Sequence, residues 1–204
     1  FPAVFSPHSL TYSSLEQSPR WFRHLSRPCS RGAAMKGIAR DARPTAREVA
    51  QRGVAMEVAL IAGTRPEIVK MAPVREALAA FPEIRTTWIA TGQHADLAEQ
   101  TLDVFGIVPD RKLSLQWKTA SLPSLAARLV ETLAESFAET RPDLVIVQGD
   151  TASAFAGATA AHLSQIPVGH VEAGLRSGDL ANPFPEEGFR RMITPITDLN
   201  FAPT

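Results

Sequence analysis

The order of apolar and polar residues predicts alternating strands and helices from residue 54 to the end of the sequence. Short apolar runs, typical of buried parallel strands, lie at 54–62, 84–91, 144–147, 167–171 and 199–202. Between them, apolar residues recur at helical spacing over 66–78, 96–105, 121–139, 151–163 and 186–194. The segment 109–118 is predicted to be a polar connection, and Gly106 to end the helix before it. This alternation indicates an α/β fold, a parallel sheet with helices on both faces.

Composition and charge exclude several classes of partner. The 204 residues include 21 Lys and Arg and 21 Asp and Glu, so no basic field favours nucleic acid or an anionic membrane. No apolar run approaches the ~20 residues that span a bilayer. The single cysteine, Cys29, has no partner for an internal disulfide. This agrees with a reducing compartment, and we predict a cytoplasmic protein.

Residues 1–55 differ in composition from the rest. Residues 1–53 carry nine Lys and Arg against three Asp and Glu, with Ser and Pro clusters and little periodicity. Such a segment buries too little apolar surface to fold, so residues 1–55 are predicted to be disordered. An organelle transit peptide would have this composition. We favour a non-native leader, translated from upstream of Met56, because no convincing amphipathic targeting helix is seen.

Three acidic sites follow one another in the second half of the sequence. Asp150 and Glu172 each follow a predicted strand, and Glu186 and Glu187 come within one further loop. Parallel strands deliver the polar groups at their carboxyl ends to one crevice at the sheet edge. The sequence therefore predicts a site lined by three carboxylates.

Each carboxylate also has a structural interpretation. Asp150 could cap the helix that follows it. Glu172 beside a buried strand needs a partner, and Arg176, four residues on, is the obvious one. Glu186 and Glu187 fit the first turn of a helix, where acidic side chains offset the macrodipole, so at least one of them is expected to be structural.

The turn after the first strand is predicted to bind an anion. Pro66 suits the first position of a helix, whose N-terminus offers free backbone N–H groups. Arg65 adds a fork suited to phosphate, although it could instead pair with Glu67. Lys70, one turn further on, adds a second positive charge.

The sequence contains neither a metal-binding pattern nor one of the common nucleotide-binding motifs. The sequence has no GxGxxG after its first strand, no Walker pattern and no zinc-like spacing. His94, His162 and His170 are interpreted as satisfied structural histidines. We therefore predict no metal site.

Six motifs occur between residues 63 and 204. They read GTRPEIVKMAP at 63–73, TGQH at 91–94, QGDT at 148–151, HVEAGLR at 170–176, PEE at 185–187 and DLNFAPT at 198–204. In order and spacing they closely resemble the non-hydrolysing UDP-N-acetylglucosamine 2-epimerases, and the likeness covers 56–204. Gln148 stands where many members carry His, which leaves the catalytic candidates unaffected.

The resemblance implies a GT-B arrangement, in which the active site lies in the cleft between two Rossmann-like domains. Residues 56–204 resemble the N-terminal domain, and the family's C-terminal domain, with its uridine-diphosphate contacts and a histidine, has no counterpart in the sequence. We therefore expect a fragment or a natural truncation, and an isolated chain without activity. For the full-length form the resemblance implies a homodimer that serves cell-envelope polysaccharide biosynthesis.

The family interconverts UDP-GlcNAc and UDP-ManNAc by eliminating UDP and adding it back. Elimination needs a base at C2 of the sugar, and re-addition needs an acid on the opposite face. By resemblance these roles fall to Asp150, Glu172 and Glu186. The reaction is redox-neutral, so neither a cofactor nor a metal is implied.

The resemblance also implies substrate-binding residues. Arg65 and Lys70 occupy the family positions that stabilise the charge of the leaving diphosphate. Gln93, His94 and Arg176 are implied to contact the substrate.

Three alternatives stay open. A GT-B glycosyltransferase would share the fold and the donor, although the PEE and HVEAG motifs disfavour it. The chain could be a non-catalytic nucleotide-sugar-binding domain. It could also belong to an epimerase that acts on a related UDP-diacetamido-uronate sugar.

Overall fold

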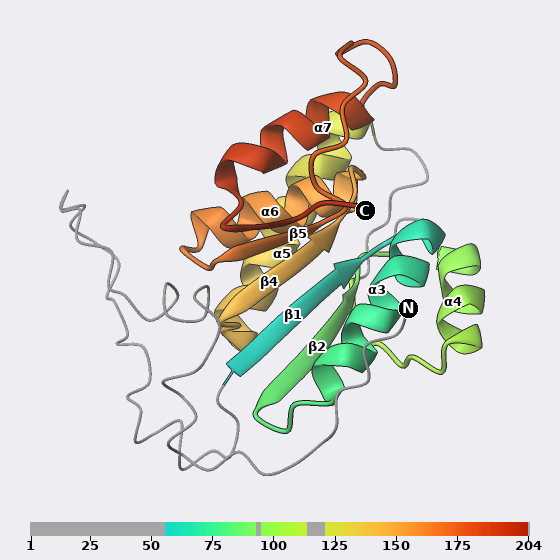
Figure 1. Ribbon diagram of the computed structural model, residues 1–204, viewed down its shortest axis with the longest axis vertical. Helices are drawn as coiled ribbons and strands as arrows, with labels where there is room; N and C mark the ends of the chain where they lie inside the picture. Colours follow the sequence, from blue (N-terminus) through green and yellow to red (C-terminus); the bar gives the residue numbers. More distant parts are fainter. Residues whose placement is uncertain (1–55, 93–94, 114–120, 204) are drawn as a thin grey trace, which may run out of the picture. The chain divides into compact units, whose positions relative to one another are not determined.

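In the part of the chain that the structure describes, six parallel strands form one sheet (Figure 1). The structure is a computed structural model and describes residues 56–92, 95–113 and 121–203, so the predictions for residues 1–55, Gln93 and His94 lie outside it. The strands are β1 (Met56–Ala62), β2 (Ile84–Ala90), β3 (Arg111–Lys112), β4 (Leu144–Gln148), β5 (Val168–Val171) and β6 (Leu199–Phe201). Their order across the sheet is β3–β2–β1–β4–β5–β6, and all neighbours are parallel.

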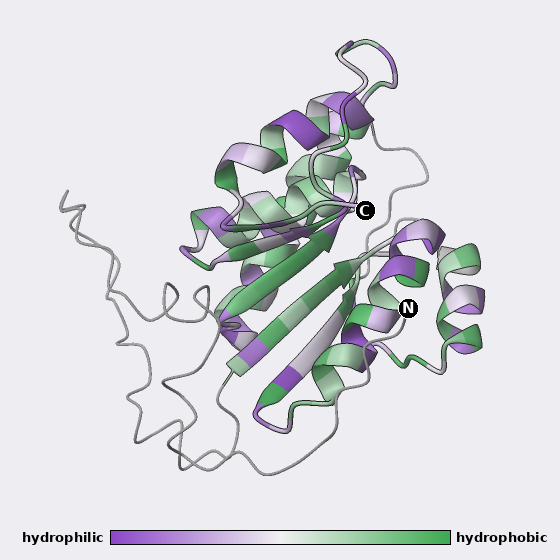
Figure 2. Cartoon of the chain, viewed as in Figure 1, coloured by the Kyte–Doolittle hydropathy of each residue, from purple (hydrophilic) through white to green (hydrophobic). Residues whose placement is uncertain are grey.

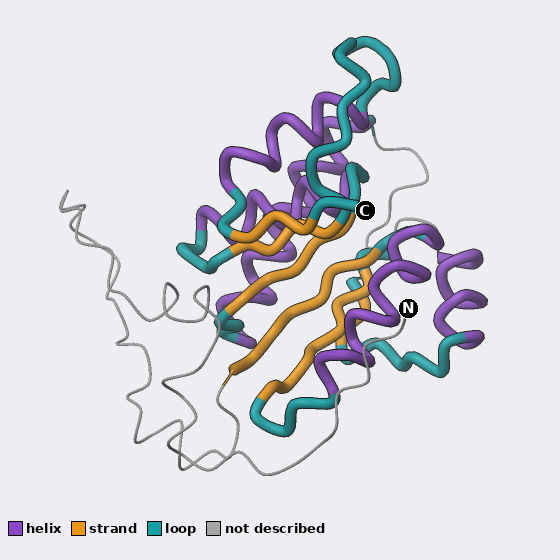
Figure 3. Tube along the Cα trace, in the orientation of Figure 1, coloured by secondary structure: helices purple, strands orange, loops and turns teal. Residues whose placement is uncertain are grey.

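Helices cover both faces of this sheet, as the purple segments of Figure 3 show. They are α3 (Arg65–Ala79), α4 (Ala95–Val104), α5 (Leu122–Thr140), α6 (Ala152–Leu163) and α7 (Glu186–Ile193), with a 3-10 turn η2 (Thr194–Ile196). Buried side chains of α3 and α4 pack on one face of β1, and those of α5, α6 and α7 belong to the core on the other face. The predicted α/β class is confirmed. None of the described helices is long and apolar enough to cross a membrane.

Alternation along β1 divides the core into two layers. Val58, Leu60 and Ala62 pack with α3 and α4, whereas Ala59 and Ile61 pack with α5 and α6. All five side chains are buried. Because both faces of the strand are covered, its sequence is a continuous apolar run, and β1 is coloured as hydrophobic over most of its length in Figure 2.

The shortest strand, β3, lies inside the segment that was expected to be a polar connection, which is a correction. It pairs with the end of β2 at one edge of the sheet. Just before it, Asp110 Oδ2 accepts a hydrogen bond from the Trp88 N–H at 2.6 Å. Because β3 consists of two charged residues, Arg111 and Lys112, it shows no alternation of apolar and polar residues, and the sequence pattern does not predict it. The rest of the segment, 114–118, lies outside the described residues.

The order of the strands changes direction between β1 and β4. From β1 the chain adds β2 and β3 on one side, and it then returns to add β4, β5 and β6 on the other. Loops that leave the carboxyl ends of two strands at such a switch point diverge and leave a crevice between them. The turns after β1 and β4, residues 63–64 and 149–151, lie at this point.

Candidate active site

Side chains from three other elements hold the turn after β4. The three pairs are Gly149 with His170 of β5, Asp150 with Arg190 of α7, and Thr151 with Glu67 of α3. His170 Nε2 lies 2.7 Å from the Gly149 carbonyl oxygen, and because a carbonyl only accepts, this nitrogen carries the proton. The turn that presents Asp150 is therefore fixed at each of its residues.

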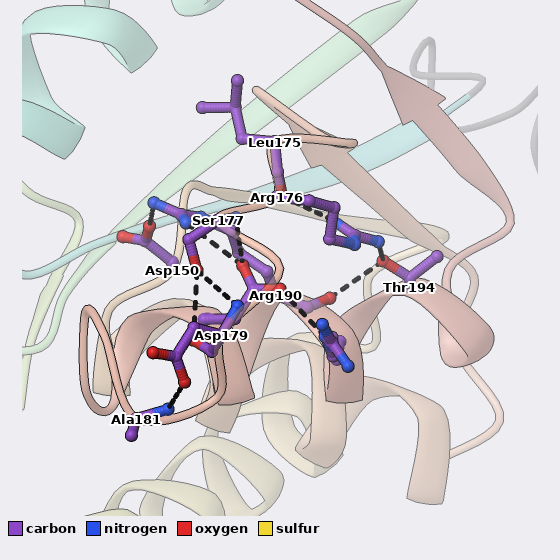
Figure 4. Close-up of polar contacts among 10 residues, drawn as sticks. Asp150, Leu175, Arg176, Ser177, Asp179, Ala181, Arg190 and Thr194 are labelled. Atoms are coloured by element: carbon purple, nitrogen blue, oxygen red, sulfur yellow. Dashed lines mark hydrogen bonds and ion pairs between the residues drawn. The ribbon is translucent and has the colours of Figure 1, made fainter.

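Asp150 does not cap α6. The cap is Thr151, whose Oγ1 accepts a hydrogen bond from the Ala154 N–H at 3.0 Å. The Asp150 carboxylate instead forms an ion pair with the Arg190 guanidinium, and the two side chains are 21% and 16% exposed. Figure 4 shows Arg190 reaching to Asp150 from the helix that carries it. The capping interpretation of Asp150 is therefore wrong.

Glu172 stands directly after β5 with a left-handed backbone, φ +63°. This conformation costs a non-glycine residue about 1–3 kcal/mol, so it persists where surrounding contacts impose it. Lys70 Nζ of α3 lies 2.5 Å from Glu172 Oε2, and Gln148 Nε2 at the end of β4 donates to the same oxygen. Such a combination of strain and held charge is typical of functional sites.

Arg176 does not pair with Glu172. Its guanidinium donates to the Leu175 carbonyl at 2.6 Å and to Thr194 Oγ1 at 2.8 Å, just past α7 (Figure 4). The predicted pairing of Glu172 with Arg176 is therefore wrong, and Lys70 takes that place. The spacing of four residues suggested this pairing, but it brings side chains together only in a helix. The chain after Glu172 forms a turn instead, so the two residues do not share a face.

Glu187 is the structural member of the acidic pair. It is fully buried; Oε2 accepts from the Ser177 N–H at 3.0 Å and Oε1 from Arg191 Nε at 2.9 Å. The Ser177 N–H and, next, the Arg191 guanidinium lower the pKa of Glu187 to about 2. Glu186 is half-buried, has no hydrogen-bond or ion-pair partner among the described residues, and lies on the face of α7 that carries Arg190.

Glu67 closes the turn after β1, which was expected to be open to an anion. Helix α3 begins at Arg65, one residue earlier than predicted. The N–H groups of Gly63 and Thr64 donate to Glu67 Oε2 at 2.8 and 2.7 Å, and the Thr64 hydroxyl donates to it at 2.9 Å. Glu67 is fully buried, and burial raises the pKa of its carboxyl against the effect of these donors. The N–H groups of Gly63 and Thr64 are thus occupied.

The predicted cations differ in their surroundings. Arg65 is exposed and has no hydrogen-bond or ion-pair partner in the described part of the chain, so it does not pair with Glu67. Lys70 is 44% exposed while it pairs with Glu172. The structure therefore brings Lys70, Glu172 and Asp150 to the carboxyl ends of adjacent strands.

His170 is buried and only partly satisfied. Burial lowers the pKa of its imidazole, and Nδ1 has no hydrogen-bond partner among the described residues. Within residues 56–92, 95–113 and 121–203 no three His, Cys, Asp or Glu side chains form a group that could hold a metal ion. His170 is thus best described as the residue that holds the Gly149 carbonyl.

The sequence of the chain matches a known protein family. The family model described as UDP-N-acetylglucosamine 2-epimerase matches residues 76–204. The chain belongs to the UDP-N-acetylglucosamine 2-epimerase family. It is 45% identical over 149 residues to the epimerase of Bacillus subtilis (strain 168) and 43% identical over 149 residues to that of Escherichia coli (strain K12). These matches cover 73% of this epimerase-family chain, which spans about 40% of the length of the curated relatives.

Solved structures of epimerases have the same fold as the described region. A crystal structure of a UDP-N-acetylglucosamine 2-epimerase matches with a TM-score of 0.70 at 45% identity, over 73% of this chain and 42% of that one. The Neisseria meningitidis epimerase bound to UDP-GlcNAc matches with a TM-score of 0.71 at 39% identity, over 73% and 40% of the two chains. The predicted Rossmann-like fold and family are confirmed.

Proposed function

We propose that residues 56–204 form the N-terminal Rossmann-like domain of a GT-B enzyme that interconverts UDP-GlcNAc and UDP-ManNAc by eliminating UDP and adding it back. The placement of two carboxylates carries the proposal. Gln148 and Val171 are the last paired residues of β4 and β5, so Asp150 and Glu172 leave the sheet side by side next to its switch point. The UDP-GlcNAc bound to the Neisseria meningitidis relative supports a nucleotide-sugar ligand.

The three carboxylates supply the acid and the base. The C2 proton of the sugar is weakly acidic, so its removal needs a positioned base, and the reverse step needs a proton donor on the other face. Asp150 and Glu172 each stand beside a cation, and their side chains are 21% and 24% exposed, which lets a substrate reach them. Glu186 completes the set, and it has no hydrogen-bond or ion-pair partner in the described region.

In this proposal side chains bind the diphosphate, since Glu67 already accepts the Gly63 and Thr64 N–H groups of the turn after β1. The exposed Arg65 offers a planar fork that suits a phosphate. The Lys70 ammonium has three N–H donors, so it can hold Glu172 and a phosphate oxygen together. Gln93 and His94 complete the proposed substrate-binding set with Arg176.

Hydrogen exchange at C2 tests this function. UDP-GlcNAc is incubated in D2O with the chain, and with a chimera in which this sequence replaces the matching 149 residues of the Bacillus subtilis relative; the parent enzyme is the reference. The chimera should place deuterium at C2 and form UDP-ManNAc, whereas the chain alone should not. If neither protein exchanges the proton while the chimera is folded, the epimerase proposal fails. Binding of UDP-GlcNAc by the chain alone would then favour a non-catalytic nucleotide-sugar-binding domain.

We further propose a cytoplasmic enzyme that works as a homodimer and supports cell-envelope polysaccharide biosynthesis. The family membership and the single cysteine of the sequence support this assignment. Light scattering on the purified chimera tests the assembly, and a molar mass of one chain would overturn the homodimer.

A further inference from the structure

A single buried carboxylate connects the two turns at the switch point. Glu67 Oε2 accepts the three donors of the turn after β1, which come from Gly63 and Thr64. Glu67 Oε1 accepts the Thr151 hydroxyl of the turn after β4 at 2.6 Å, across a sequence separation of 84 residues. A carboxylate has about four acceptor sites on two oxygens, so one Glu satisfies both turns.

The residues that Glu67 holds are the neighbours of the functional candidates. Thr64 directly precedes Arg65, and Thr151 directly follows Asp150. We propose that Glu67 is a positioning residue that fixes the turn carrying Asp150 against the turn carrying Arg65. The roles of Asp150 and Arg65 rest on the proposed function, whereas the link between the turns does not.

A link of this kind affects catalysis because it sets the distance between the two loops that it joins. The proposed chemistry needs the leaving diphosphate near Arg65 and the C2 carbon near a carboxylate at the same time, and these sit on different loops. A displacement of about 1 Å at a reacting centre can cost about 100-fold in rate. Removing the link should therefore lower kcat in molecules that remain folded.

The chain offers a matched control at the other end of the same two strands, where β1 and β4 begin. Asp143 Oδ2 accepts the Glu57 N–H at 2.9 Å, so it also joins the segments of β1 and β4, but at their amino ends. Asp143→Ala removes a carboxylate link between the same two segments without touching the site. It separates a general loss of stability from a loss of positioning.

The test is a double-mutant cycle in the chimera, because Glu67→Ala would leave buried donors unpaired and endanger folding. At temperatures below the melting range, Glu67→Gln and Thr151→Val should each lower kcat by about 10–100-fold relative to wild type. The double variant should be no slower than the slower single variant, because both changes act on the same link: Thr151→Val removes it, and Glu67→Gln replaces its charged acceptor with an amide. Thr151→Ser keeps the hydroxyl and should restore most of the rate, and Asp143→Ala should leave kcat unchanged.

Multiplicative losses in the double variant would overturn the positioning role, as would an equal loss of kcat in Asp143→Ala. A second readout needs no activity. In amide NMR spectra of the 15N-labelled 204-residue chain, Thr151→Val should shift the signals of both Gly63 and Asp150, whereas Asp143→Ala should shift neither. If Thr151→Val left the chemical shift of the Gly63 amide unchanged, the link would also be overturned. An inactive wild-type chimera would count against the proposed function alone.

Discussion

Replacing Asp150 with Asn separates chemistry from structure at the centre of the site. The amide keeps the shape of the carboxyl group and an oxygen that accepts from Arg190, but it cannot serve as a base. The α6 cap survives, because Thr151 supplies it. A surface ion pair is worth about 0–1 kcal/mol, but the Asp150 and Arg190 side chains are only 21% and 16% exposed, so the loss exceeds that range unless Arg190 keeps another partner. The Glu187 carboxylate, 3.5 Å from the other terminal nitrogen of Arg190, continues to balance that charge.

The expected stability loss is therefore about 1–2 kcal/mol, between the values for a surface pair and for a buried pair left without compensation, and it lowers the melting temperature of a domain of this size by about 2–8 °C. Turnover should fall about 100- to 10,000-fold, the usual contribution of a general acid or base. Circular dichroism melting and C2 exchange in the chimera measure the two effects. Thr151→Val is the reference for the melting temperature alone, since it removes a cap worth about 0.5–2 kcal/mol. Retained turnover, or a melting temperature lowered more than by Thr151→Val, would refute the reasoning.

Two further predictions concern the scaffold. The pKa of Glu187, about 2, lies below that of a free carboxyl, so Glu187 stabilises the fold above about pH 4.5 and loses this effect as the pH falls towards 2. Urea denaturation should find Glu187→Gln less stable than wild type at pH 7, with most of this difference lost near pH 2, and a pH-independent difference would contradict this. Gly157→Ala should destabilise α6, because the new Cβ would lie 2.9 Å from Val147 Cγ1, and overpacking of about 1–3 kcal/mol exceeds the gain of about 1 kcal/mol in helix propensity. Gly188→Ala meets no atom within 4 Å and should stabilise α7, so the same sign in both melting curves would refute the packing argument.

Apolar spacing predicted the layers of the fold because burial determines them. The stripe Leu125, Leu129, Leu133 and Phe137 lies on the buried face of α5 as its spacing indicates. Strand β3 is two charged residues at a sheet edge, where pairing with β2 rather than burial defines the strand, and the pattern missed it.

The positions of the site carboxylates could be predicted, but their partners could not. Local sequence places Asp150 and Glu172 after strands, whereas Lys70 pairs with Glu172 across 102 positions and Glu67 with Thr151 across 84. Such contacts depend on β1 and β4 being neighbours, which the sequence pattern does not state. One local signal was available. A Thr at the cap with a Glu three positions into the helix is a capping-box pattern, and it indicates that Glu67 closes the start of α3.

The two ion pairs of the site come from opposite layers of the fold. Lys70 belongs to α3, which packs on one face of the sheet, and Arg190 belongs to α7, which packs on the other. Glu172 and Asp150 are thus each held from a different side of the sheet edge. The proposed reaction needs an acid and a base on opposite faces of one carbon, so carboxylates held from opposite layers suit it. Glu186 has neither restraint, and the loop that leads into α7 determines where it stands.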